Sequence, residues 1–437
     1  MRRAISAAVA LALVAAGAAA EERSLTLRQA IELALAGPAV RASEAQAEAA
    51  ATLVGQARAA RLPAIDASAT ANFLRDDPGL VVPRGAFGNP IALPLVTGDR
   101  QTQAVGVSVR QLLYDFGRTG AALASARAAA GAGASEVQAR RREVALATVR
   151  AYAGCYAASR QVEVIERAAT AADETVRVVT AMVDQGILAR SDQLAAEYHR
   201  ENVLADLADA RRIATAACAR LTALTGVAVT PLGLPPETAD DAPSATVARA
   251  LAQRPELTAL ARERAALEAR AREARAERLP LLALAAGAQK SWDHYLLHES
   301  NAAAALVLQA RVFDGGAAAA EAARFAAQAR AAAAGEEALR RQIVAEVETA
   351  AAGVTAARQR VAAGERAVAA ADEALRLERL QHSAGLATTR ELLEAMTQAT
   401  AANDGLAAAR AALVAARAEL AAAAGDDLLD VFGEGAR

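Results

Sequence analysis

The sequence has few large side chains. Hydrophobic residues make up 54% of the 437 positions, but aromatic residues make up only 3%, and most of the hydrophobic fraction is alanine. So few large side chains would fill a close-packed globular core poorly, whereas alanine lets helices approach one another closely. We therefore expect long, thin helices that lie side by side.

Long apolar runs and a strong net charge are also missing. After Ala20, Arg, Glu or Gln interrupts the alanine-rich stretches every few positions, so we expect no transmembrane helix, which needs about 18 apolar residues or more. The formal net charge of −2 gives no argument for nucleic-acid binding.

The segment from Met1 to Ala20 has the pattern of a cleaved secretory signal peptide. Arg2 and Arg3 precede an apolar run from Ala7 to Ala16, and alanines close the segment. No cysteine follows the run, so we expect no lipid-anchored N-terminus. The chain is therefore expected to be exported, with a mature start near Glu21.

One large tandem repeat organises the rest of the sequence. Arg61-Leu62-Pro63 recurs as Arg278-Leu279-Pro280 at an offset of 217, and Tyr114-Asp115-Phe116-Gly117 recurs as Phe313-Asp314-Gly315-Gly316 at an offset of 199. The offset falls between these landmarks, so the first copy carries an insertion in this interval. The Pro and Gly residues of the insertion predict an irregular surface loop. We place repeat 1 at 21–226, a Pro-rich linker at 227–243, repeat 2 at 244–425 and a tail at 426–437.

Each copy contains one predicted β-hairpin, at about 64–114 and 281–313. In the first copy Ile65, Ala67 and Ala69 alternate with Asp66, Ser68 and Thr70, a period of two that indicates strands with one apolar face. The same facing recurs at Val105, Val107, Val109, Leu282, Leu284, Ala286, Leu306 and Leu308.

The strands have a length that suits a membrane. About 10 residues cross a bilayer at a tilt, and apolar-out alternation is the transmembrane barrel pattern, although a soluble hairpin on a core shows the same alternation. Four strands are too few to close a membrane barrel, since the smallest have about 8. Several protomers would have to contribute strands.

The segments around the hairpins are predicted to be helical, because they are rich in Ala, Arg, Glu and Leu with almost no Pro. Long helices are expected at 118–185 and 317–384, each roughly 100 Å long at 1.5 Å per residue. Shorter ones are expected at 38–61, 187–225 and 388–424. A seven-residue repeat in the last helix predicts coiled-coil packing through Leu392, Ala399, Leu406, Leu413 and Leu420.

The two cysteines fall at matching distances from a predicted turn. Cys155 precedes Gly186 by almost the same stretch of sequence as the one by which Cys218 follows it. In an antiparallel helix pair they would reach nearly the same level, which predicts a disulfide. The alternative is that both are small buried hydrophobic residues.

Several motifs, in this order, resemble the TolC-like outer-membrane efflux protein family. They are the segment from Leu25 to Leu35 followed by Pro38, the strand end Leu112-Leu-Tyr-Asp-Phe-Gly-Arg118, and Gly385 followed by Glu391-Leu-Leu-Glu-Ala395. The resemblance implies an α+β membrane protein located in the outer membrane and extending into the periplasm. In it, a homotrimer would form a 12-stranded barrel from four strands per protomer, continued by a periplasmic α-helical coiled-coil barrel.

The resemblance also implies partners and site residues. A periplasmic adaptor protein and an inner-membrane pump are the expected partners, with docking at the turns formed by Gly186, Ile187, Leu188, Gly385 and Leu386. Acidic residues in the family ring the tunnel entrance six and nine positions after the second turn glycine. That count gives Glu391 and Glu394, with Asp192 in the first copy. The alternative is that they are ordinary solvated surface acids.

No arrangement of residues predicts enzyme activity or a cofactor. His294 and His298 lie near Glu299 in the second hairpin loop, which suits an exposed polar loop better than a metal site. The leading function is a passive outer-membrane exit duct for a tripartite efflux pump or a type I secretion system. A periplasmic coiled-coil adaptor or scaffold without a pore is the alternative, and a metal-binding carrier is a third. Drugs, metal ions and polypeptides all remain open as substrates.

Overall fold

The computed structural model describes residues 23–88, 90–236, 243–296 and 298–432. The predicted signal peptide, residues 1–20, lies outside this part. The chain divides into two compact units. Unit 1 comprises the residues up to Glu44, Glu136–Leu257 and those from Ala338 onward, and unit 2 comprises Ala45–Ser135 and Thr258–Glu337.

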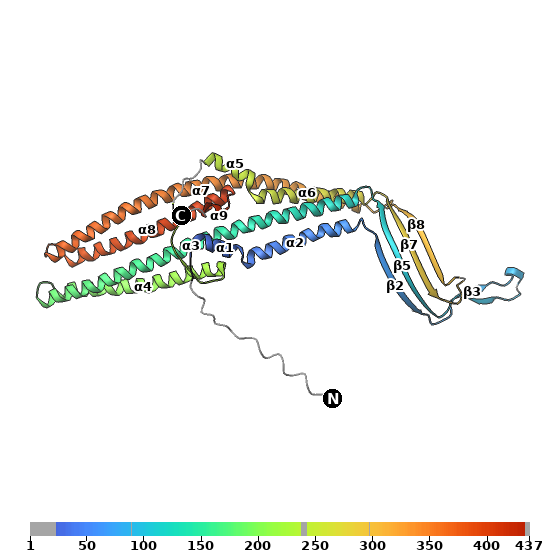
Figure 1. The fold of residues 1–437 in the computed structure, drawn as a ribbon, viewed down its shortest axis with the longest axis horizontal. Coiled ribbons are helices and arrows are strands. Elements are labelled where there is room, and N and C mark those ends of the chain that lie inside the picture. Colours follow the sequence, from blue (N-terminus) through green and yellow to red (C-terminus); the bar gives the residue numbers. More distant parts are fainter. Residues whose placement is uncertain (1–22, 89, 237–242, 297, 433–437) are drawn as a thin grey trace, which may run out of the picture. The chain divides into compact units, whose positions relative to one another are not determined.

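Unit 2 contains a four-stranded antiparallel sheet with the order β2-β5-β7-β8. Its strands are β2 (Ala64–Phe73), β5 (Gln101–Tyr114), β7 (Leu281–Trp292) and β8 (Ser300–Gln309). The two predicted hairpins are therefore β2 with β5 and β7 with β8, and β5 pairs with β7 to join the copies into one sheet (Figure 1).

The insertion of the first copy is a second, smaller sheet. The expectation of an irregular loop was wrong, because β3 (Gly79–Val82) and β4 (Leu93–Val96) pair as antiparallel strands around a short 3-10 helix, Ala86–Gly88. Leu and Val fill most positions of the two strands, although Gly79 begins β3 and Pro94 lies within β4. The other Pro and Gly of the described part of this interval lie in the connection and the flanks. Counting breakers over the whole interval hid the short strands between them.

The helices occur in pairs of equal length. α2 (Pro38–Ala59) and α6 (Pro255–Ala276) have 22 residues each, whereas α3 (Arg118–Asp184) and α7 (Ala317–Ser383) have 67 each. α4 (Arg190–Thr225) and α8 (Thr389–Ala424) have 36 each. No range was predicted for α6. The bounds of the other five helices differ from the predicted ones by at most three residues, and the largest difference is at the start of α4, which was expected at residue 187.

Antiparallel helix pairs build unit 1. α3 and α4 lie side by side in Figure 1 and share a cluster that includes Ile165, Val203 and Leu207. α7 and α8 form the second pair, packed through residues such as Ile343, Val354 and Leu413. Four of the five predicted seam positions of α8 are buried, and Leu406 is half-buried.

The largest fully buried side chain of unit 1 is Tyr152 of α3. Its hydroxyl lies 2.9 Å from the carbonyl oxygen of Leu25 and 3.0 Å from that of Gly233, and it donates toward both. These contacts hold the start of the described chain and the segment between the repeats against one helix. Burial raises the pKa of this phenol, so the group stays a neutral donor.

Short elements complete unit 1. α1 (Leu27–Leu35) begins with a capping box in which Thr26 and Gln29 exchange hydrogen bonds of 3.0 and 3.3 Å. β1 (Arg23–Leu25) pairs in parallel with β6 (Val229–Pro231), so the predicted linker supplies a strand. α5 (Pro243–Gln253) follows, and the predicted tail contains α9 (Leu428–Val431). Among the described helices, none has a stretch long and apolar enough to cross a membrane.

Candidate functional site: a two-faced sheet and two helical turns

The four-stranded sheet of unit 2 has one apolar face and one polar face. The strand register aligns Val107 with Ala67 and Ala288, and Leu284 with Leu306, so the apolar residues of all four strands share one side. Leu306 and Leu308 are each 70% exposed on it. The apolar side carries Ile65, Ala67, Ala69, Ala71, Phe73, Val105, Val107, Val109, Leu282, Leu284, Ala286, Ala288, Ala302, Ala304, Leu306 and Leu308.

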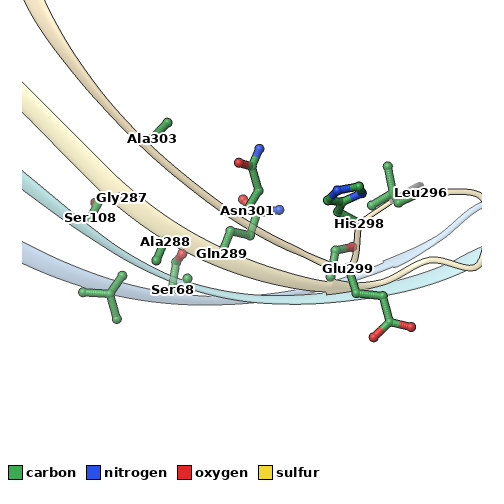
Figure 2. Close-up of a pocket in the computed structure, with 13 residues that line it drawn as sticks. Ser68, Ser108, Gly287, Ala288, Gln289, Leu296, His298, Glu299, Asn301 and Ala303 are labelled. Carbon is green, nitrogen blue, oxygen red and sulfur yellow. The ribbon is translucent and has the colours of Figure 1, made fainter.

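Hydroxyl, amide and charged groups gather on the opposite side of the sheet. Ser68, Gln289 and Asn301 line a hollow of about 460 Å³ there, part of which Figure 2 shows. Asp66 and Arg110 lie on the same side by the strand register. An exposed apolar face backed by a polar face is the arrangement of a sheet that separates lipid from water.

Aromatic side chains lie at both ends of the sheet. Tyr114 and Phe116 are exposed at the end from which α3 leaves, with ring centroids 4.8 Å apart. Phe73 and Trp292 are exposed at the other end, where the chain's only lysine, Lys290, lies 5.3 Å from the Trp292 ring. Aromatic belts and long cationic side chains mark the two interfaces of membrane proteins. The scarcity of aromatic residues in the sequence does not by itself indicate that they gather at the two ends of the sheet.

An aspartate links each hairpin to its long helix. Asp314 accepts hydrogen bonds from the N–H groups of Gly316 (2.8 Å) and Ala318 (3.0 Å), and these hold the pKa of its carboxyl below the usual value. Asp115 has the same role, accepting from the N–H groups of Gly117 and Thr119. Both carboxylates satisfy exposed N–H groups at a helix start and serve structure.

The glycine turns at 186 and 385 end the two long helices. Gly186 has φ 75° and Gly385 has φ 72°, the left-handed conformation in which glycine has no steric penalty. The residues after them bond back into the helix, with the N–H of Ile187 on the Met182 carbonyl and that of Leu386 on the Gln381 carbonyl.

This geometry turns apolar side chains into solvent. Ile187 is 61% exposed and Leu386 is 81% exposed, while Leu188 is half-buried. The geometry of an αα-hairpin turn requires the glycine but does not require apolar side chains after it. The exposure of Ile187 and Leu386 therefore points to a role beyond forming the turn.

Two of the three predicted gate acids cap helices. Glu391 is the third residue of α8, and its carboxylate accepts from the N–H and the hydroxyl of Thr388, both at 2.8 Å. These hydrogen bonds, with the charge of Arg390, hold the pKa of Glu391 below its usual value. Asp192 has the same place in α4 and accepts from the N–H of Ala189 at 3.2 Å.

Glu394 lies one turn further along α8 than Glu391. It is exposed, and its carboxylate accepts from Gln398 at 3.4 Å. Spacing of three residues puts both glutamates on neighbouring positions of one helix surface. Asp192 is the third residue of a different helix, α4, so of the three acids only the two glutamates share one helix.

A buried histidine that the sequence analysis did not single out supports the second turn. His382 is only 6% exposed, and its Nε2 atom lies 3.3 Å from the hydroxyl of Thr389. The contact joins the last turn of α7 to the first turn of α8. The sequence signal was available, since a histidine three residues before a turn glycine is in the last helical turn.

Cys155 and Cys218 are bonded to each other as a disulfide between α3 and α4, with Cα atoms 4.7 Å apart. Cys155 is fully buried beside Tyr152 in the largest cluster of unit 1. The equivalent positions of the second copy are Val354 and Arg417, so only the first helix pair is cross-linked.

In the second hairpin loop, His294 contacts an aspartate of the first copy. Its Nδ1 atom lies 2.8 Å from Asp99, and the backbone N–H of His294 donates to the same carboxylate. Across all described residues, no three His, Cys, Asp or Glu side chains are placed to hold a metal ion.

Comparison with known proteins shows to which family the chain belongs. The model of the family described as outer membrane efflux protein matches residues 30–227 and 246–426, which together are most of the chain. The chain belongs to this family. The resemblance stated from the motifs is thus confirmed. The chain is a subunit of an outer-membrane efflux channel, located in the outer membrane and extending into the periplasm.

Solved structures have the same fold at low sequence identity. The outer membrane protein VceC of Vibrio cholerae is 20% identical with a TM-score of 0.75, covering 92% of this chain and 96% of its own. The Campylobacter jejuni CmeC outer membrane channel is 15% identical with a TM-score of 0.78, covering 91% and 85%. The open state of the Neisseria gonorrhoeae MtrE outer membrane channel is 20% identical with a TM-score of 0.74, covering 92% and 89%.

No curated protein sequence matches the chain. The family is one of transport conduits, and neither the family match nor the solved folds support the alternative of an adaptor without a pore.

Proposed function

We propose that three copies of this chain form one channel, in which each protomer gives four strands to a 12-stranded transmembrane barrel. This proposal rests on the four-stranded sheet, which has an exposed apolar face, a polar opposite face and aromatic residues at both ends. In the proposed barrel, the face of Val107 and Leu306 meets lipid and the face of Ser68 and Asn301 lines water.

The open edges of the sheet support assembly. β2 and β8 are its outer strands, and within the described residues each pairs on one side only. Unpaired backbone N–H and C=O groups cannot be left in lipid, so a membrane sheet must close on itself. Pairing β8 of one protomer with β2 of the next closes the sheet around a three-fold axis.

The helices form the periplasmic part of the proposed channel. α3 and α7 would each contribute roughly 100 Å of helix. The turns at Gly186 and Gly385, which end these helices, would lie at the periplasmic tip of the channel. There the exposed side chains of Ile187 and Leu386 would dock onto the adaptor of a tripartite pump. The chain itself supplies a passive exit route, and an inner-membrane pump supplies the energy.

Glu391 and Glu394 form the proposed gate ring, with Asp192 contributing from α4. Three-fold symmetry turns each glutamate into three like charges around an axis, which attracts cations and repels anions. Hydrogen bonds from Thr388 favour the ionised form of Glu391 and orient its carboxylate, whereas among the described residues Glu394 has one longer hydrogen bond, from Gln398. Glu394 is therefore the more adjustable member of the ring.

Ion selectivity in planar bilayers tests both the channel and the ring. Purified protein should conduct, and E391Q/E394Q should lower the cation-to-anion permeability ratio several-fold, because six negative charges leave a three-fold entrance. Glutamine at the third helical position still completes a capping box, so the turn is retained. The variant A195E adds a negative charge at the position of the first copy that is equivalent to Glu394, and it should raise the cation-to-anion permeability ratio.

The two proposals fail in different ways in this experiment. An unchanged ratio in E391Q/E394Q and in A195E contradicts the gate ring alone. Absence of any conductance from correctly assembled protein contradicts the channel.

A further inference from the structure

The β3–β4 hairpin has no equivalent in the second copy, which lacks the insertion. It starts after β2 and returns into β5, so it leaves the sheet at the end opposite to the start of α3. Figure 1 shows it projecting beyond the ends of the four long strands. In the proposed channel this end of the sheet faces the cell exterior.

Both faces of this hairpin are apolar. The register pairs Leu80 with Leu95 on one face and Val81 with Pro94 on the other. Leu80 is 66% exposed and Val81 is 68% exposed. Arg84 is the only charged residue from Pro78 to Gly98. A hairpin that stood free in water would carry polar residues on at least one face.

The base of the hairpin, in contrast, is charged and rigid. Asp77 accepts two hydrogen bonds from the Arg100 guanidinium, at 2.7 and 2.9 Å. Asp99 binds His294, and its backbone N–H donates to Asp293, so the base is fastened to the β7–β8 connection. These charges are costly in hydrocarbon, so we expect the base to lie outside it and the hairpin beyond the base to lie away from lipid tails.

In the proposed channel, the hairpins of the two other protomers offer matching apolar surfaces. A three-fold channel holds three such hairpins around one opening, each fixed at its base. Tethering gives them a high effective concentration for one another, so a weak apolar contact becomes well populated. Burial of exposed Leu and Val then stabilises contact between the copies.

We propose that the three β3–β4 hairpins of one channel pack against one another over its outer mouth and form an apolar constriction there. The inference rests on the proposed trimeric channel. Apolar constrictions close a pore because water leaves them readily, and they open when the apolar contacts separate. The mouth would therefore have its own barrier, separate from the acidic ring at the helical turns.

Chemical cross-linking tests the contact between hairpins. The two native cysteines are joined to each other, so an L80C variant presents one new thiol per protomer. A short, water-soluble bismaleimide should join L80C protomers into dimers on a denaturing gel. L306C, on the outward apolar face of the sheet, is the matched control and should stay monomeric on that gel.

Single-channel recording tests the barrier. The variant L80S/V81S should show a several-fold rise in conductance over the unchanged protein, because serine weakens the apolar packing. The variant I65S/L306S, altered at equally exposed apolar positions on the outer face of the sheet, should not show this rise.

The contrary results distinguish failure of the hairpin contact from failure of the proposed channel. L80C that stays monomeric in particles with three-fold symmetry would overturn the hairpin contact and leave the proposed channel intact. Labelling of L80C by a membrane-soluble maleimide alone would also overturn it, because the hairpin would then lie in lipid. Absence of three-fold particles from the unchanged protein would instead defeat the proposed channel.

Discussion

Replacing Val107 with arginine is expected to prevent assembly in the outer membrane, whereas the same replacement of its neighbour Ser108 is expected to be tolerated. Val107 is at the centre of β5 on the apolar face, and Ser108 is on the polar face. An arginine facing lipid at mid-bilayer costs about 2–4 kcal/mol. In the proposed three-fold channel every protomer would bear this cost. V107R and S108R add the same charge, so they differ only in the face of the sheet that receives it.

Fractionation of cells that express each variant measures this effect. S108R should be recovered from the outer membrane at close to the level of the unchanged protein, and it should shift ion selectivity toward anions. V107R should accumulate in the periplasm or be degraded. Equal recovery of the two variants would mean that the apolar face of the sheet does not meet lipid.

Removing the disulfide is expected to loosen α3 and α4 without a matching change in α7 and α8. The bond joins positions with a sequence separation of 63, for which loss of the cross-link costs about 4 kcal/mol in the chain-entropy model. The variant C155A/C218A leaves no unpaired thiol. Hydrogen exchange around Cys155 should become faster, while exchange around Val354, the equivalent position of the second copy, should change little.

Thiol titration provides the control for this variant. Unchanged protein that is denatured without reductant should show no free thiol, and reductant should expose two. Two free thiols before reduction would contradict the disulfide. Equal acceleration of exchange in both helix pairs would show that the bond acts on the whole unit rather than on one pair.

The long-range plan of this fold could be predicted from the sequence because the duplication repeats its landmarks. The repeated strand end at Asp115 and Asp314 located the starts of the long helices, and the expected turns at Gly186 and Gly385 located their ends, to within a few residues. Period-two alternation located the four long strands. These signals are local or are repeated in the chain, so they need no knowledge of which distant residues meet.

Features that depend on distant contacts were not predictable in the same way. β1 and β6 are three residues long each and become strands only because they pair with each other. The Tyr152 hydroxyl donates toward Leu25 of β1 and toward Gly233, which follows β6, and no spacing rule indicates this contact. The short strands β3 and β4 were hidden by the Pro and Gly that lie within and around them.

The hydrogen bonds of the acids near the turns were also not predicted from the sequence. Counting from Gly385 located Glu391 and Glu394, but the count did not indicate that Thr388 binds Glu391 in a capping box. Residue type does contain this information, because a threonine three positions before a glutamate at a helix start is the signature of that motif. The two glutamates therefore differ in freedom although they have the same charge.

Single-particle imaging of protein extracted from the outer membrane in mild detergent tests the central claim most directly. Three protomers that share one barrel should appear as a hollow particle with three-fold symmetry. A detergent belt should surround the sheet region, and the helical part should measure roughly 100 Å, as helices of 67 residues require. A monomer, or a solid particle without a detergent belt, would contradict the account.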